Sequence, residues 1–174
     1  MILPFDEVDA LITKVKSSEK TEVKELEDSV LDLLILDYVY GTAAASEMLG
    51  IDIQPDMDEM KASVEKKVAG KDFRQRIREY APSNDVESIA RVIDTDSTRV
   101  FNEALLNGAK KAGATTKTWN TMLDDRVRDA HIVLQSVTIP LDAEFYTDGD
   151  HAPAPGQFNE AYLNCGCRCW LTVQ

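Results

Sequence analysis

The sequence lacks a long hydrophobic run. Its longest apolar stretch, VLDLLILDYVY at residues 30–40, is interrupted by Asp32 and Asp37. Because a helix that crosses a bilayer needs about 20 mostly apolar residues, we expect no membrane-spanning segment and no membrane partner. The first residues, MILPFDEVDA, carry acids where a secretory signal peptide carries Lys or Arg. We therefore expect a protein that stays in the cytosol where it is made.

The common signatures of catalysis are also missing. No nucleophile elbow, phosphate-binding loop or zinc finger with long ligand spacing occurs, and we find neither an internal repeat nor a low-complexity segment. The 174 residues, 44% of them hydrophobic, suffice for one good core or for one domain with a helical appendage. Composition and spacing alone therefore indicate a soluble α+β domain with a Cys-rich last strand.

Positive charge is scarce. The net charge is −12, and residues 1–60 carry 15 acidic against 4 basic residues. Such a surface repels nucleic acid, so DNA contact would have to use the basic stretch at residues 66–78, which we interpret as a solvated helix face. The acidic first third is either a solvated surface or a face complementary to a basic partner. A wide apolar stripe on its second helix indicates that this helix is either central to a bundle or buried against a partner subunit, and we favour the partner.

The N-terminal residues 1–81 are predicted to be helical. Apolar residues at helical spacing predict helices over 4–17, from about Thr21 to Gly50 with a kink at Gly41, over 57–69 and over 72–80. Gly50 suits the left-handed position that ends a helix. We expect this part to serve oligomerisation or the docking of a partner.

A domain boundary is predicted near residues 81–85, so that residues 82–174 form a second part. Pro82-Ser83-Asn84-Asp85 is a strong helix start, and the long amphipathic helix that follows should end near residues 108–113. Beyond it, an alternating pattern predicts short strands near Trp119, Val133, Val137, Ile139, Phe145 and Tyr146. The fold class is therefore α+β: a mainly helical N-terminal part, one long amphipathic helix, and a small, mostly antiparallel C-terminal sheet.

Three cysteines lie close together near the C-terminus. Their odd number and the expected cytosolic location disfavour disulfides, which leaves free thiols or a metal site. If residues 164–170 form a strand, Cys165, Cys167 and Cys169 point to one side of it. His131, Cys165 and Cys167 would then bind zinc, with Cys169 or His151 as a fourth ligand. The alternative is a set of small buried thiols, with His131 hydrogen-bonded into the sheet.

A second group of polar residues lies in the segment DDRVRDAH. Asp125, Arg126, Arg128 and His131 can be interpreted as a catalytic acid, base and anion clamp, which would indicate a toxin or hydrolase. No nucleophile or second carboxylate accompanies them. We therefore favour a structural role, in which Asp125 caps a turn and an arginine binds a carboxylate such as Asp96 or backbone carbonyls. Trp119 and Trp170 are interpreted as core anchors.

Five motifs follow one another in the second half of the chain. The helix VIDTDSTRVFNEA contains Thr95, Arg99, Asn102 and Ala104, and is followed by Lys117-x-Trp119, DDRVRDAH, Pro155-Gly156 and Asn164-Cys165-Gly166-Cys167. In this order and spacing, residues 86–174 resemble the phage Mu F-like minor head proteins, also called phage head morphogenesis proteins. Asp94, Asp96 and Gly166 stand where the family usually has Arg, Glu and Arg. Both Cys-Gly-Cys and Cys-Arg-Cys fit the terminal motif.

The resemblance implies a minor structural protein of a tailed-phage or prophage head. Such proteins act in procapsid assembly, at the portal or in the capsid interior, and remain near packaged DNA. It therefore implies the portal, the major capsid protein or a scaffolding protein as partner, and the virion head interior or host cytoplasm as location. It implies neither catalysis nor a cofactor, and zinc is the one ion that the residues themselves suggest. Our runner-up hypotheses are a toxin or hydrolase using His131 and Asp125, and a zinc-stabilised interaction module.

Overall fold

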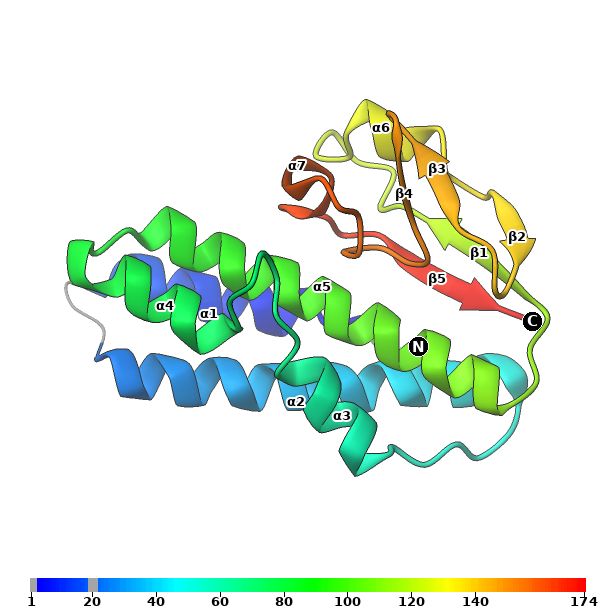
Figure 1. Ribbon diagram of the computed structural model, residues 1–174, viewed down its shortest axis with the longest axis horizontal. Helices are drawn as coiled ribbons and strands as arrows, with labels where there is room; N and C mark the ends of the chain where they lie inside the picture. The colour runs from blue at the N-terminus through cyan, green and yellow to red at the C-terminus, as the bar shows by residue number, and fades with distance from the viewer. Residues whose placement is uncertain (1–2, 19–21) are drawn as a thin grey trace.

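The computed structural model describes residues 3–18 and 22–174, and it confirms the α+β fold. Figure 1 shows a layer of long helices with a small β-rich unit on one side of it. The helical layer contains α1 (Phe5–Ser17), α2 (Val23–Leu49), α3 (Met57–Val64), α4 (Phe73–Tyr80), the 3-10 turn η1 (Ala81–Ser83) and α5 (Val86–Lys111). The β-rich unit contains β1 (Thr116–Asn120), α6 (Asp129–Ile132), β2 (Thr138–Pro140), β3 (Phe145–Thr147), β4 (Asp150–Ala152), α7 (Ala161–Asn164) and β5 (Trp170–Val173).

The helix ends follow the local signals in the sequence. Asp56, Asp72 and Asp85 cap α3, α4 and α5 by accepting hydrogen bonds from backbone N–H groups of the first turn. Gly50 ends α2 with φ of 66°, as predicted. The cap expected at Thr21 lies outside the described residues. The predicted helix over 57–69 is shorter, because the chain leaves α3 at Val64 and turns back through a β-bridge between Val68 and Lys71.

Gly41 does not interrupt α2, which continues from Val23 to Leu49. Its role is to let α2 and α5 approach closely. A Cβ atom at this position would lie 2.2 Å from the carbonyl oxygen of Phe101 and 2.9 Å from the Cβ of Ala104. The missing side chain therefore sets the distance between the two longest helices.

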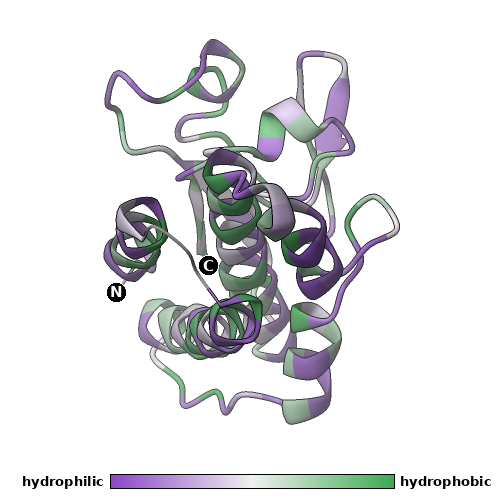
Figure 2. Cartoon of the chain, turned by 90° about the vertical axis from the view of Figure 1, so that its left-hand side faces the viewer, coloured by the Kyte–Doolittle hydropathy of each residue, from purple (hydrophilic) through white to green (hydrophobic). Residues whose placement is uncertain are grey.

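The helix α5 is shared by two hydrophobic clusters. One, the helical core, contains Val30, Leu34 and Ile77 and packs α1 to α4 against α5; Figure 2 shows α5 with the other helices around it. The other, the C-terminal core, packs the β-rich unit against Phe101 and Leu105 of α5. Since α5 has residues in both clusters, both halves of the chain rest on it, and the end of α2 also reaches the C-terminal core through Ala44 and Ala45.

The C-terminal sheet is antiparallel, with strand order β2-β1-β5, and β3 and β4 form a separate hairpin. In β1, Trp119 lies opposite Leu171 of β5, and both side chains are buried. Two predictions at this end were wrong. Val133 lies in a turn after α6, and β5 begins only at Trp170, so the segment with the three cysteines is not a strand. Gly166 has φ of 67°, which breaks the alternation.

Candidate metal centre

Three potential metal ligands meet in the C-terminal core. Nδ1 of His131 lies 3.7 Å from Sγ of Cys167 and 3.5 Å from Sγ of Cys169, and the three atoms all lie within 4.8 Å of one another. All three side chains are buried, each 2% exposed. Imidazole and thiolate are ligands that zinc and related metals prefer, so this group can hold a metal ion.

The helix α6 positions His131. This single turn follows Arg128, whose carbonyl accepts the first hydrogen bond from the N–H of His131 at 2.8 Å. The imidazole packs between aromatic rings: its centroid lies 5.4 Å from that of Trp119 and 5.8 Å from that of Phe158. Nε2 is buried without a hydrogen-bond partner among the described residues. The ring is therefore held by packing, with Nδ1 facing the two sulfur atoms.

The helix α5 positions the two cysteines through their backbone. Thr98 donates from Oγ1 to the carbonyl of Cys167 at 2.6 Å, and Asn102 donates from Nδ2 to the carbonyl of Cys169 at 3.1 Å. Asn102 also accepts from the N–H of Leu171 through Oδ1 at 3.0 Å. Because buried backbone groups need partners, these two polar side chains fix an otherwise irregular segment on the helix. The bond from Thr98 spans 69 positions of the sequence, and the bond from Asn102 to Cys169 spans 67.

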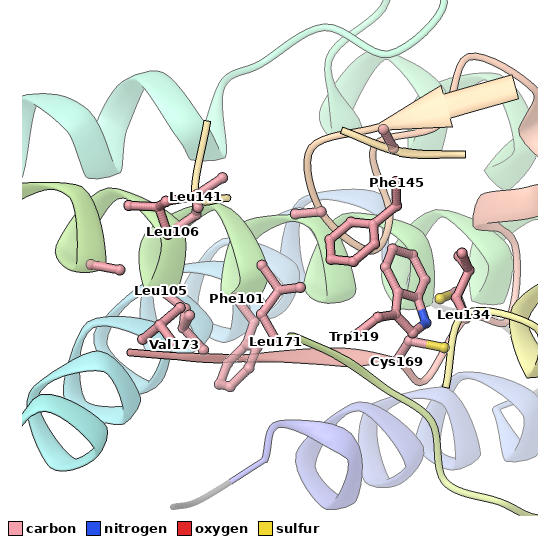
Figure 3. Close-up of a cluster of buried hydrophobic side chains, with 14 of the residues drawn as sticks. Phe101, Leu105, Leu106, Trp119, Leu134, Leu141, Phe145, Cys169, Leu171 and Val173 are labelled. Atoms are coloured by element: carbon pink, nitrogen blue, oxygen red, sulfur yellow. The ribbon is translucent and has the colours of Figure 1, made fainter. Parts of the chain in front are cut away.

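The two thiols differ in acidity. The hydrogen bond between them lowers the pKa of Cys169, and the nearby Trp119 side chain lowers it further. The same bond, together with burial, raises the pKa of Cys167. Figure 3 shows the Cys169 sulfur beside the indole ring of Trp119, in the group that also includes Phe145 and Leu134. Burial opposes this lowering at Cys169, so the bond between the two thiols is what separates their pKa values.

Cys165 and His151, both named by the sequence, lie outside this group. Cys165 is half-buried, and it lines a different pocket together with residues of α4 and α5. His151 is exposed and pairs with Glu144, with Nδ1 2.6 Å from the carboxylate. The structure thus brings together Cys167 and Cys169 in place of Cys165 and Cys167. The reason is the turn at Gly166, which removes Cys165 from the common face.

Arg128, the second arginine of DDRVRDAH, binds the backbone of α7 and of the residue that follows it. Arg128 donates to the carbonyls of Tyr162 and Cys165, as one of the sequence alternatives proposed. The carboxylate of Asp96, which was the other partner proposed for an arginine of this segment, pairs instead with Arg76 and Arg99. Arg128 therefore connects the start of α6 to the segment around α7.

The acids at the start of the same segment lie in a turn. Asp124 accepts a hydrogen bond from the N–H of Arg126 and also pairs with Arg168. Asp125, where the cap was predicted, is exposed. The turn is thus capped by the residue before the one that the sequence indicated, because the side chain of Asp124 reaches the N–H group two positions later.

Three other motif residues also hold the C-terminal core. Asn164 exchanges hydrogen bonds with the backbone of Phe158, at 2.9 Å and 2.7 Å. Lys117 is 1% exposed, and its Nζ donates to the carbonyl of Pro153 at 2.8 Å, while burial lowers its pKa to about 8. Trp119 is completely buried, whereas Trp170 is only partly so. The anchor predicted at Trp119 is thus present.

Asp94, on α5, lies close to Gly166 and Arg126 of the C-terminal unit. Burial raises its pKa to about 6, against the opposing effects of the Gly166 N–H and of Arg126. One of its oxygens, Oδ2, has no hydrogen-bond partner among the described residues. The positive charges of Arg126 and Arg168 act on this carboxyl from the C-terminal unit.

The hollow next to the three ligands is small. It has a volume of about 10 Å³ and is lined by residues 126–128, His131 and 166–169. A space of roughly this size holds a single water molecule, which is too little for an organic substrate. The arrangement can therefore complete a metal's coordination, but it offers no substrate cleft at His131.

Comparisons with protein-family models, curated proteins and solved structures found no match to this chain.

In the described part of the chain, every helix is too short or too polar to cross a membrane.

Proposed function

We propose that this chain is a minor structural protein of a tailed-phage or prophage head, which acts without catalysis in procapsid assembly at the portal or capsid interior. One observation carries the proposal. Each of the five family-like motifs, although they are spread from Thr95 to Cys167, supplies at least one residue that contacts α5 or packs in the unit that rests on it, namely Asn102, Trp119, His131, Gly156 and Asn164. These residues make packing contacts, and the hollow next to His131 is too small for a substrate. Such an arrangement favours a protein that binds a partner over an enzyme.

The contacts of individual motif residues support a structural role for the pattern. Asn102 ties β5 to α5, Asn164 closes the loop before α7, and Arg128 binds two carbonyls of the last turn. Gly156 lies so close to α5 that a Cβ there would be 2.9 Å from the N atom of Arg99. Its φ of 80° also favours glycine. Close packing against α5 therefore accounts for the glycine of the Pro155-Gly156 motif, and no ligand-binding role is needed to explain it.

The acidic helical part is the surface proposed to meet the partner. Among its described residues, three large apolar side chains are exposed: Val39 on α2, Ile51 just after α2, and Met57 on α3. Acidic charge combined with exposed apolar residues favours a basic protein partner, such as a portal, capsid or scaffolding subunit, over DNA. Self-association through α2 is the alternative use of the same surface.

Particle composition tests this function. The chain should be found, in few copies, in particles purified from a phage lysate or an induced prophage and analysed by quantitative mass spectrometry. It should also co-purify with the co-expressed portal or capsid protein, and substitution of Val39 and Ile51 by Asp should reduce that co-purification. Absence from purified particles, together with no binding to any head protein, would overturn the proposal.

For the metal centre we propose zinc. A tetrahedral zinc ion with bonds of about 2.3 Å to sulfur and about 2.0 Å to nitrogen separates an S ligand from an N ligand by about 3.5 Å. The distances from His131 Nδ1 to Cys167 and Cys169 are 3.7 Å and 3.5 Å, so both nitrogen–sulfur separations match those of a zinc site. The water-sized hollow beside them offers the fourth position. The bound ion would cross-link α6 to the segment before β5.

Metal analysis of protein purified without chelator tests this assignment. One equivalent of zinc is expected in the wild type, and Cys169→Ser should lose most of it. Cys165→Ser is the matched control: it removes a neighbouring thiol outside the group and should keep the zinc. Zinc clearly below one equivalent in the wild type, or equal loss in both variants, would contradict the proposed centre. In that case His131, Cys167 and Cys169 are buried packing groups.

A further inference from the structure

A second cavity lies between the helical layer and the C-terminal segment, away from the three metal-ligand candidates. It has a volume of about 210 Å³. Its walls come from the loop after α3, from α4 and α5, and from α7 with the residue after it. Figure 1 shows that loop passing across α5 toward α7. The space greatly exceeds the roughly 30 Å³ that one water occupies, so it is large enough for a small organic molecule.

The charged residues that line this cavity are all basic. Arg76 and Arg91 line it, and its lining residues include no Asp or Glu. Arg76 pairs with Asp96, which is buried and also pairs with Arg99. Arg99 also pairs with Glu103 at 3.1 Å, so among the described residues the cavity's guanidinium group without an ion pair is that of Arg91. The carboxylate of Asp85, at the N-cap of α5, is hydrogen-bonded to Ser88, and the charge of Arg91 also lowers its pKa.

Several hydrogen-bond donors of the cavity have no acceptor among the described residues. Arg76 donates from Nε to the carbonyl of Asp72 and from Nη2 to Asp96, which leaves Nη1 unused. Arg91 donates only from Nε, to the carbonyl of Glu87, which leaves both Nη atoms. Thr95 is 7% exposed, and its Oγ1 also lacks a partner in the described part of the chain.

The rest of the lining suits the organic part of a ligand. Val68, Val92 and Ala161 supply apolar surface, and the ring of Tyr80 and the half-buried Cys165 complete the wall. The free Nη atoms of two guanidinium groups offer more donors than the two oxygens of a planar carboxylate readily accept. A tetrahedral phosphate presents three or four acceptor oxygens, and arginine binds phosphate through parallel N–H groups.

We propose that this cavity binds a small phosphate monoester, with its phosphate between Arg76 and Arg91 and its organic part against Val68, Val92 and Ala161. The site is independent of the assembly role and of the metal centre. It joins α4 and α5 to the C-terminal segment, so a bound ligand would stabilise the contact between the two parts of the chain.

Titration calorimetry with inorganic phosphate and glycerol 3-phosphate, at constant ionic strength, tests the proposal. The monoester should bind more tightly than inorganic phosphate, because only it uses the apolar wall. Arg91→Gln should weaken binding roughly tenfold or more, since it removes a charge-assisted hydrogen bond. Arg74→Gln is the control, because Arg74 lies on α4 over the ring of Phe73 and is not part of the lining.

A thiol-labelling measurement locates the ligand. Cys165 lines the cavity, whereas Cys167 and Cys169 are buried elsewhere. Glycerol 3-phosphate should slow the alkylation of Cys165, read by peptide mass spectrometry, and this protection should be lost in Arg91→Gln. Equal binding by both arginine variants, acetate binding as tightly as the monoester, or unchanged labelling of Cys165 at saturating ligand would each overturn the proposal.

Discussion

The two hydrophobic cores that share α5 are built on different principles. The helical core is mainly aliphatic, and its members recur at helical spacing along α1 to α5. The C-terminal core combines Trp119, Phe145, Phe158 and two cysteines, most of them on short strands and loops. The first core is specified by periodicity, whereas the second depends on single residues that have no repeated pattern to replace them.

The difference extends to the polar groups. Along the helices, backbone hydrogen bonds are satisfied locally, and side-chain caps are needed only at the ends. In the C-terminal unit, loop carbonyls are satisfied by distant side chains, those of Thr98, Asn102, Lys117 and Arg128. A substitution in the second core therefore removes both packing and the partner of a buried backbone group.

Replacing the central aromatic residue should give the largest loss. Trp119→Ala removes a completely buried indole that packs on Phe145 at 5.1 Å and on His131 at 5.4 Å. We expect the free energy of unfolding to fall by about 3–5 kcal/mol, measured by urea denaturation. Trp170→Ala, at a partly exposed position, should cost clearly less. Similar losses in the two variants would show that Trp119 is not the anchor of this core.

The second-largest loss of stability is expected where α2 and α5 approach each other closely. Gly41→Ala places a methyl group 2.2 Å from the carbonyl oxygen of Phe101, so the helices must separate, at a cost of about 3 kcal/mol. Gly108→Ala is the matched control on the same helix pair. There the nearest atom would be the Cβ of Ala45 at 3.1 Å, and better helix propensity offsets part of the strain. Thermal unfolding of both variants measures the difference, and equal stability would contradict the tight crossing.

A buried acid makes the helical core sensitive to pH. Asp37 is 0% exposed, and its carboxyl lies near Ser97 without meeting hydrogen-bond geometry. Burial raises its pKa to about 8, from 3.8. The folded state thus keeps a proton that the unfolded state releases. The resulting stability is complete below pH 4, falls between about pH 4 and 8, and is lost above pH 8.

Asp37→Asn should remove this dependence. We expect it to raise the free energy of unfolding by about 2 kcal/mol at pH 9 and to change it little at pH 4. Urea denaturation at the two pH values measures the effect. A variant that is no more stable than the wild type at pH 9 would show that the carboxyl is solvated. Asp32→Asn, an exposed position on the same helix, is the control.

The sequence predicts the first core far better than the second, for a physical reason. Helical periodicity and the cap at Asp85 are local signals, and α1, α2, α4 and α5 were found close to their expected bounds. The alternation of the cysteines is also local, but it misled us because Gly166 turns the chain. Only the folded chain brings His131 to Cys169, 38 residues later. The residue types indicated a thiol–imidazole group, but spacing could not decide which two thiols belong to it.

The variant with the smallest expected loss of stability tests whether α5 links the two cores. Asp85→Ala removes the side chain that accepts from the N–H of Ser88 and should cost about 1 kcal/mol. Asp72→Ala removes the equivalent cap from α4, which packs in the helical core alone. Hydrogen exchange distinguishes them. The first variant should lower protection in both α2 and β5, because α5 supports both, whereas the second should leave β5 unchanged. If Asp85→Ala affects α2 but not β5, the cores unfold independently, and α5 is no more than their point of contact.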